Sequence, residues 1–384
     1  MTDAVQNSRR WRATLISQPL SRAVQSSGAR PATFDRFEAN ARQPSEIGGT
    51  QSLRVSSRAF QVNDARLLSI DGGGVFGIIP ARILQYIEEK TGRPIRELFH
   101  MISATSTGGI VAAGVAVGIP CKELVSLYLE DAQQVFSRTE IYKSESADGL
   151  LKPKFTDDGI QAVLKKRLGD VRLDEAQIDL VLTAHDLNRG TPKFFGSWDP
   201  HYRYLMRDCV RATSAAAPVL PPAVVQDLDE TEGKLYLIDG AFAGLTNPIT
   251  IGLAEAYARY PNAKRVSALS LGTGDVVSTV NGEDALQWGS AKFALPLIKI
   301  MSESPASAND FIARRYLTPG KTFFRINPPV RGVGSFDDGS PANMKMLLDQ
   351  TETYIEANKD QLDTLCAALM AEVNSRQTMM GATS

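Results

Sequence analysis

The chain has 384 residues, a formal net charge of −1, and 43% hydrophobic residues. This length and apolar content allow a large buried core, whereas the balanced charge, without a basic tract, gives no electrostatic support for binding nucleic acid. The three cysteines are widely spaced and have no metal-ligand histidines near them, so we expect free thiols, a reducing compartment, and neither a metal nor another cofactor.

The first sixty residues differ in composition from the rest of the chain. They contain nine arginines, no lysine and many serines. We predict a partly disordered or domain-wrapping arm over residues 1–60, with the targeting segment of a translocated effector or an organelle precursor as the alternative. The start has no hydrophobic signal-peptide core, and no apolar run is long enough to span a bilayer. A soluble, cytoplasmic protein that meets membranes only peripherally is therefore expected.

A glycine run follows the first apolar segment, residues 67–70, which reads as a β-strand. The run is Asp71-Gly72-Gly73-Gly74-Val75-Phe76-Gly77. Residues without a Cβ can turn successive backbone N–H groups toward one point, which is what a developing oxyanion requires in acyl transfer. We therefore identify Gly72, Gly73 and Gly74 as a candidate oxyanion hole.

The same glycines have a second interpretation. Gly72, Gly74 and Gly77 fit G-x-G-x-x-G, the dinucleotide-binding fingerprint, which also requires an acidic residue about twenty positions later at the end of another strand. Glu88 and Glu89 fall instead inside an amphipathic helix that Thr91-Gly92 ends. A nucleotide-binding oxidoreductase thus remains only a rival hypothesis.

A second turn presents Ser106 between an apolar strand at 100–103 and a helical stretch at 110–117. A serine on a sharp strand-to-helix bend needs small residues two positions before and after it, because strand and helix approach closely there. Ala104 and Gly108 meet this need. Ser106 is therefore the predicted nucleophile.

Farther along, residues 131–158 mix aromatic, leucine and charged side chains and form a candidate lid or lipid-entry rim, with core packing or a plain loop as alternatives.

The base that would activate Ser106 is either a histidine or a carboxylate. His100 opens the strand before the elbow, and His201 lies in a polar aromatic loop, whereas His185 ends an apolar run and is the best histidine alternative. Asp239 ends the strand at 235–238 and precedes the small residue Gly240. A partly buried aspartate there can take a serine proton directly, so a Ser106–Asp239 dyad is the preferred prediction.

Apolar runs and helical stretches alternate along the whole chain. The runs lie at 67–70, 100–103, 178–184, 235–238, 266–271 and 322–326. This alternation predicts an α/β fold with a mainly parallel sheet covered by helices on both faces. Near the C-terminus, a sevenfold apolar stripe, Met344, Leu348, Ile355, Leu362 and Leu369, predicts helices that pack on their own domain, or else join two subunits in a homodimer.

With these pieces in order, the chain resembles the patatin-like phospholipases, whose pattern is a DGGGxRG loop, a GxSxG elbow and a DGG or DGA turn. The segments 211–218 and 269–274 resemble further parts of that family, so the likeness covers roughly Ala65 to Val330. Three positions depart from the pattern: Phe76 replaces an arginine, Ala104 replaces the first elbow glycine, and His100 replaces a frequent aspartate.

The resemblance implies a three-layer α/β/α fold and a lipid acyl hydrolase of the phospholipase A or lysophospholipase type. It assigns Ser106 as nucleophile, Asp239 as base and the backbone of Gly72, Gly73 and Gly74 as oxyanion hole. The supporting motif residues are Asp71, Gly77, Ala104, Gly108 and Gly240.

The expected organisation is an arm over residues 1–60, a catalytic domain over 61–335 and a helical extension over 336–384. The substrate would be a phospholipid or another acyl lipid, although without the motif arginine head-group recognition is less secure than ester hydrolysis. An acyltransferase or thioesterase, and a catalytically silent lipid-binding regulator, are the alternatives.

Overall fold

The structure is a computed structural model that describes residues 64–381, except 150, 202, 277–279 and 318–321. The predicted arm over residues 1–60 lies outside this part of the chain. The described residues form a sheet with the strand order β5-β6-β3-β2-β1-β7-β9, and β4 pairs with β3 beside this path. These strands are β1 (Asp64–Ile70), β2 (Met101–Thr105), β3 (Asp179–Asp186), β4 (Thr191–Gly196), β5 (Ala223–Val225), β6 (Leu235–Asp239), β7 (Arg265–Leu271) and β9 (Phe323–Ile326). Two short strands, β8 (Asp275–Val276) and β10 (Pro329–Val330), pair with each other.

The centre of the sheet is parallel, and one side of it is antiparallel. Strands β9, β7, β1, β2 and β3 run parallel to their neighbours, whereas β4 and β6 pair with β3, and β5 with β6, in the antiparallel sense. Each of the six predicted apolar runs forms one of these strands. The sequence did not indicate β4, which is largely exposed and contains no continuous apolar run, or β5, whose apolar run is only three residues long.

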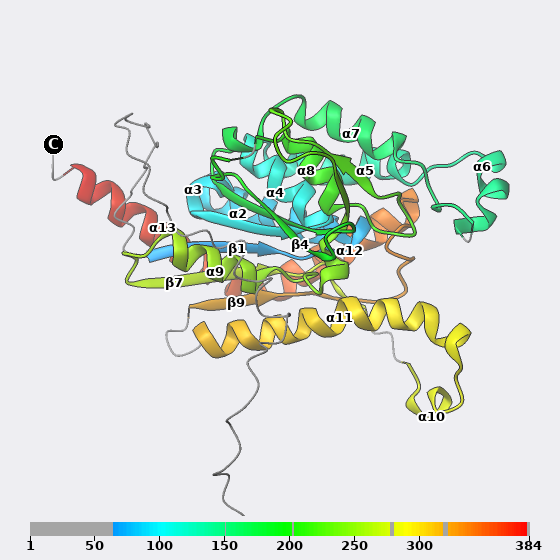
Figure 1. The fold of residues 1–384 in the computed structure, drawn as a ribbon. Coiled ribbons are helices and arrows are strands. Elements are labelled where there is room, and N and C mark those ends of the chain that lie inside the picture. Colours follow the sequence, from blue (N-terminus) through cyan, green and yellow to red (C-terminus); the bar gives the residue numbers. More distant parts are fainter. Residues whose placement is uncertain (1–63, 150, 202, 277–279, 318–321, 382–384) are drawn as a thin grey trace, which may run out of the picture. The chain divides into compact units, whose positions relative to one another are not determined.

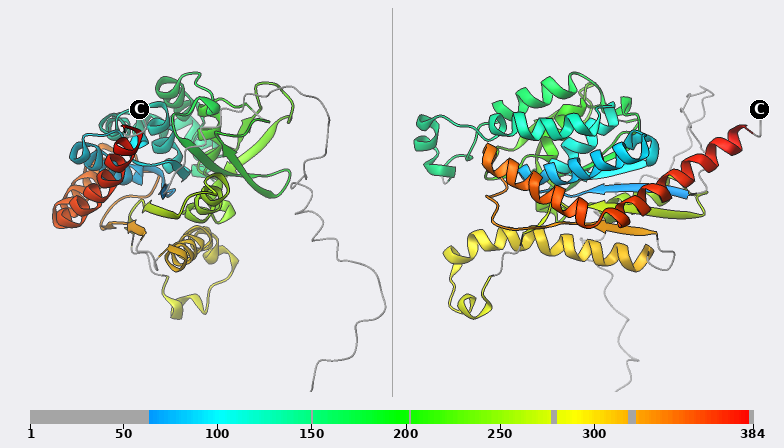
Figure 2. Two further views of the ribbon diagram at one scale, coloured as in Figure 1. Left: turned by 90° about the vertical axis from the view of Figure 1, so that its left-hand side faces the viewer. Right: turned by 180° about the vertical axis from the view of Figure 1, so that it is seen from behind.

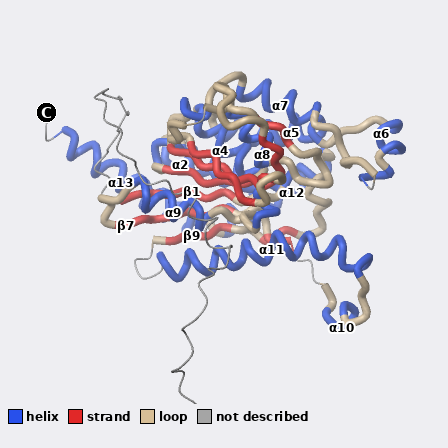
Figure 3. Tube along the Cα trace, in the orientation of Figure 1, coloured by secondary structure: helices blue, strands red, loops and turns tan. Residues whose placement is uncertain are grey.

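Helices cover both faces of the sheet (Figures 1 and 3). Successive apolar side chains of β1 point to opposite faces, so both faces must be covered. Leu68 and Ile70 belong to the larger apolar core, while Ala65 and Leu67 belong to a second core on the opposite face. The larger core contains side chains of α2 (Ile78–Thr91), α3 (Ile95–Leu98), α4 (Thr107–Val117), α5 (Cys121–Val135), α7 (Asp158–Leu168) and α8 (Met206–Thr213). The second contains side chains of α9 (Ile249–Arg259) and α11 (Ser290–Leu317). This is the expected three-layer α/β/α class.

Local sequence signals explain where α2 ends. Its buried side chains recur at helical spacing, and the helix stops at Gly92, whose φ of 64° lies in the left-handed region that glycine adopts without strain. The Glu88 carboxylate accepts hydrogen bonds from the backbone N–H groups of Ile95 (3.1 Å) and Cys121 (2.7 Å). This acidic residue is therefore engaged by neighbouring chain segments, away from the end of any second strand.

The C-terminal apolar stripe packs on the chain's own core. It lies on α12 (Pro341–Ala357) and α13 (Lys359–Gly381), which contact α2 (Figure 2). Met344, Ile355 and Leu362 are buried in the same cluster as the residues of α2. Asn358 caps α12, so two helices replace one continuous coil. Of the two outcomes predicted for this stripe, packing within one chain is the one found.

Two smaller helices complete the fold, α6 (Glu140–Glu145) and α10 (Gly282–Ala285). Cys121, Cys209 and Cys366 are buried free thiols. In the part of the chain that the structure describes, no helix combines the length and the apolar character needed to cross a bilayer.

Candidate active site

Ser106 lies on a strained turn between β2 and α4. Its φ of 57° and ψ of −127° are unusual for a residue with a side chain, and such strain is typical of a nucleophile elbow. A Cβ on Gly108 would lie 2.7 Å from the backbone oxygen of Asp71, closer than real contacts allow, so only glycine fits there. Ala104 is fully buried in β2, where its methyl group is accommodated. Ser106 therefore lies on a sharp strand-to-helix bend despite the replaced glycine.

Asp239 ends β6 and has the environment that a general base needs. Its side chain is only 2% exposed, its Oδ1 atom accepts a hydrogen bond from the backbone N–H of Ala241 at 2.9 Å, and its carboxylate interacts with the Ser106 hydroxyl. Burial raises the pKa of Asp239 from 3.8 to about 7, while the hydrogen bonds from Ala241 and Ser106 oppose this rise. A carboxyl with this pKa can accept and return protons near neutral pH.

One segment of chain, Thr213 to Ala215, joins the nucleophile turn to the aspartate turn. The Oγ1 atom of Thr213 accepts a hydrogen bond from the Ser106 N–H at 2.8 Å, and the Ser214 hydroxyl donates to the Ser106 carbonyl at 3.3 Å. The carbonyl of Ala215 accepts from the Asp239 N–H at 3.0 Å. Because these hydrogen bonds hold the backbone of both turns, this segment sets the spacing of the Ser106 and Asp239 side chains. Sequence reasoning had marked it only through the family resemblance of residues 211–218.

The glycine loop lies directly beside Ser106. A Cβ on Gly72 would be 3.0 Å from the Cβ of Ser106. The Gly72 N–H, however, donates to the carbonyl of Thr246 at 2.9 Å, whereas the N–H groups of Gly73 and Gly74 have no partner among the described residues. Gly74 has a φ of 59°, which is accessible without strain only to glycine. The backbone N–H groups of Gly73 and Gly74 are thus available to donate hydrogen bonds, whereas the small size of Gly72 lets the loop lie close to Ser106.

Asp71 anchors the start of this loop through a buried ion pair with Arg325 of β9. The guanidinium donates two hydrogen bonds to the carboxylate, at 2.9 and 2.5 Å, and a third to the Ser270 hydroxyl at 2.8 Å. Burial raises the pKa of Asp71, and the charge of Arg325 opposes that effect. Phe76, at the position of the motif arginine, is buried at the cleft wall. A cation from a distant strand therefore pairs with the first residue of the glycine loop.

Replacing Arg325 with methionine is expected to lower the free energy of unfolding by about 3–5 kcal/mol at pH 8, because Asp71 would be left buried without a partner. Urea unfolding followed by circular dichroism measures this effect. Arg265→Met is the matched control: it removes an ion pair with Asp64 of 2.7 Å at a half-exposed site and should cost about 1 kcal/mol or less. Equal effects of the two substitutions would contradict the anchoring role.

A large cleft of about 1360 Å³ opens onto Ser106 and Asp239. One part is apolar and is lined from α5, α7 and the 216–220 segment; its residues include Leu127, Ala132, Val135, Ile160, Val163, Leu164, Val219 and Leu220. Another part is polar and is lined from α11 and β9 by Glu303, Ser307, Asp310, Arg314 and Arg325. A substrate with a long apolar chain and a polar end matches this division.

None of the three histidines lines this cleft. The Nδ1 atom of His100 accepts a hydrogen bond from the Arg66 N–H at 2.8 Å, and its ring packs near Tyr260 at the start of β2, the opposite end of the strand from Ser106. His185 lies in β3 opposite Ile238. His201 is in an exposed loop. The Asp239 carboxylate, rather than a histidine, is thus the titratable side chain beside Ser106.

The remaining motif residues support the turns sterically. Gly77 lies where a side chain would overlap Tyr128, and a Cβ on Gly240 would be 2.8 Å from the Cβ of Thr183. In the predicted rim segment, Phe136 lines the cleft and contacts Phe155 edge to face at 5.6 Å between ring centres. Ile141, on α6 of the same segment, is 74% exposed.

Comparisons with known proteins show which family the chain resembles. Residues 68–253 match the family model described as patatin-like phospholipase. Patatin-T5 of Solanum tuberosum is 27% identical to the chain, with 79% of this chain and 87% of that protein covered. Patatin-17 of Solanum cardiophyllum is also 27% identical, with 76% and 87% covered. A further relative, 26% identical with 79% and 90% covered, is named probable inactive patatin-3-Kuras 1 of Solanum tuberosum.

Two solved structures are similar at lower identity. They are VipD from Legionella pneumophila (12% identity, TM-score 0.36, covering 76% of this chain and 67% of that one) and the type III effector ExoU (13%, TM-score 0.31, covering 78% and 53%). The site and the fold define an α/β protein with a serine–carboxylate pair. Residues 68–253, which match the family model, form a patatin-like phospholipase domain.

Proposed function

We propose that this protein is a lipid acyl hydrolase of the phospholipase A or lysophospholipase type that uses a Ser106–Asp239 dyad. The observation that carries the proposal is the contact between a serine on a strained elbow and a buried aspartate whose pKa is raised to about 7. A nucleophile with an adjacent base suffices for covalent catalysis. The named relatives are patatins, and the matched domain is a phospholipase family, which supports the substrate class.

The reaction proceeds in two halves. Ser106 Oγ attacks the carbonyl carbon of a fatty acyl ester while its proton passes to Asp239, and the backbone N–H groups of Gly73 and Gly74 stabilise the tetrahedral oxyanion. As the ester bond breaks, Asp239 returns the proton to the departing alcohol and an acyl-enzyme remains. Water then attacks the acyl-enzyme and gives a proton to Asp239, which returns it to Ser106 Oγ as the acyl–oxygen bond breaks and the fatty acid leaves. This cycle requires no cofactor.

The cleft orients the substrate across this dyad. The apolar part between α5 and α7 would hold the acyl chain, and the polar part beside α11 would hold the glycerol and head group. Arg325 is paired with the buried Asp71, whereas the half-exposed Arg314 pairs with Asp310 through Nε at 2.8 Å and would turn its terminal N–H groups to an anionic head group. Phe76 continues the apolar wall where the motif arginine would have placed a charge.

Incubation with mixed phospholipids, lysophospholipids and neutral glycerides tests the proposal. Mass spectrometry should detect fatty acids released by the wild-type protein and none released by Ser106→Ala. Transfer of the acyl group to an added alcohol or thiol, with little free fatty acid, would instead identify an acyltransferase. Absence of release together with failure of a fluorophosphonate to label Ser106 would identify a silent lipid-binding protein and refute the proposal.

A further inference from the structure

Helix α11 has two faces with different surroundings. On the inner face, Asp310 and Arg314 line the catalytic cleft, and Ala313 and Leu317 are buried in the core beneath the sheet. The outer face is exposed, although it is rich in large apolar side chains. The exposed fractions there are 47% for Leu297, 40% for Ile300, 57% for Met301, 58% for Phe311 and 41% for Ile312.

These residues form one stripe. At 100° per residue, the positions that share the outer face are Phe293, Leu297, Ile300, Met301, Ser304, Ala308, Phe311, Ile312 and Arg315. A helix on a protein surface normally turns its polar side to solvent. Here the layer farthest from the sheet on that face is α11 itself, next to α9 (Figures 1 and 2). A contiguous exposed apolar face of this kind marks a docking surface.

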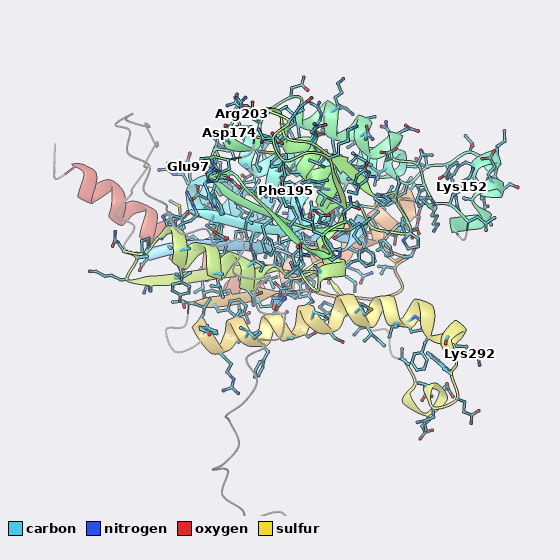
Figure 4. All side chains as sticks on the ribbon, in the orientation of Figure 1. Glu97, Lys152, Asp174, Phe195, Arg203 and Lys292 are labelled. Atoms are coloured by element: carbon cyan, nitrogen blue, oxygen red, sulfur yellow. The ribbon has the colours of Figure 1, made fainter. Side chains whose placement is uncertain are left out.

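The chemistry of the stripe identifies its partner. It contains no carboxylate, and its one charged residue is Arg315, whose guanidinium lies 5.2 Å from the centre of the Phe311 ring. Tyr316, 72% exposed, follows at one end. At the other end Trp288 contacts Phe293 edge to face, near Lys292, which Figure 4 labels on the projecting end of the helix. Apolar side chains flanked by aromatic rings and cations suit the boundary between lipid tails and anionic head groups.

We propose that the outer face of α11 docks on an anionic lipid surface and so brings the cleft beside its substrate. This inference rests on the proposed lipid hydrolysis and adds the surface through which the protein reaches its substrate. Continuity supports it, because one helix carries the apolar stripe on its outer side and cleft-lining residues on its inner side. Lipid bound to the outer face therefore lies one helix diameter, about 10 Å, from the polar part of the cleft.

The test replaces two outer residues with acids, Leu297→Glu together with Ile312→Glu. Both side chains are over 40% exposed, so the fold should be retained, and the new charges would meet anionic head groups. The matched control is Val224→Glu with Tyr257→Glu, two apolar residues of similar exposure, 58% and 52%, on β5 and α9. Circular dichroism and gel filtration verify folding and mass; if the acidic pair unfolds the protein, Leu297→Gln with Ile312→Gln takes its place.

Binding is measured by co-sedimentation with phosphatidylcholine vesicles containing phosphatidylglycerol, using the Ser106→Ala protein so that no lipid is consumed. We expect the α11 pair to lower vesicle binding by about tenfold or more and the control pair by less than about twofold. In the active protein, the α11 pair should lose fatty acid release from vesicles by a similar factor. Hydrolysis of a short-chain monomeric ester should remain near the wild-type rate.

Three results would overturn the docking proposal: unchanged vesicle binding, equal losses on vesicles and on the monomeric ester, or a wild-type dimer that the substitutions dissociate, which would assign the stripe to a second copy of the chain. The vesicle-binding outcome can be separated from the proposed function. Vesicle binding by Ser106→Ala does not need catalysis, and a hydrolytically silent protein would refute the proposed function while leaving the docking result readable.

Discussion

Ser106→Ala is expected to abolish fatty acid release, with a fall in rate of up to about a million-fold, because the hydroxyl that meets the Asp239 carboxylate is removed. Residual activity would come only from binding and the backbone donors. The release of fatty acid from a phospholipid, followed by mass spectrometry, measures the loss. The backbone of Ser106 is held by hydrogen bonds to the side-chain hydroxyls of Thr213 and Ser214, so the fold should be unchanged.

Ser103→Ala is the matched control for this loss. Ser103 lies in β2, three residues before Ser106, and its buried hydroxyl has no hydrogen-bond partner among the described residues. Removing that hydroxyl should leave the rate within about twofold of wild type, since no hydrogen bond is lost. Hydrolysis that persists in Ser106→Ala, at rates like those of Ser103→Ala, would refute the assignment of the nucleophile.

Asp239→Asn is expected to reduce the rate by about 10² to 10⁴, the usual contribution of a general base. Asparagine can still accept the hydrogen bond from Ala241, so the geometry of the turn is kept while the proton acceptor is lost. In the wild type, kcat/KM should rise with pH up to about pH 7 and then level off, because only the ionised carboxylate of Asp239 can accept the proton. That ionisation should be missing from the profile of the variant.

His185→Ala provides the opposing control. If a histidine were the base, this variant would lose activity and Asp239→Asn would keep it. The position of His185 outside the cleft predicts the reverse result. A pH profile unchanged by Asp239→Asn would likewise contradict the dyad.

Asp239→Asn should also stabilise the folded protein at alkaline pH. The pKa of Asp239 is about 7 in the folded protein, against 3.8 as the ordinary value, so the folded state binds the proton more tightly between pH 4 and 7. The free energy of unfolding contributed by this group therefore falls as the pH rises through that window. Asp239→Asn removes the buried charge and should raise the free energy of unfolding at pH 8 by up to about 4 kcal/mol, with little effect at pH 4. Urea unfolding at both pH values measures the difference.

Local sequence was sufficient to predict the elements that carry the reacting groups. Each of the six predicted strands is a short, mostly apolar segment, because strands in a sheet covered by helices on both faces need apolar residues at most positions. Ser106 could be identified because the bend around it tolerates only small residues, and Gly72 to Gly74 because only glycine lets the backbone approach so closely. These constraints act within a few residues, so they are visible in the sequence.

Contacts between distant segments decided the rest. Arg325 meets Asp71 across 254 positions, and no pattern near either residue indicates the pair. Three other features depend in the same way on how the strands are ordered. The Gly72 N–H donates to the Thr246 carbonyl, the three histidines lie outside the cleft, and residues 213–215 hydrogen-bond to both the Ser106 and Asp239 turns. The exposed stripe of α11 resembles a buried face in sequence, because apolar spacing specifies which residues share a side of a helix but not whether that side faces the core.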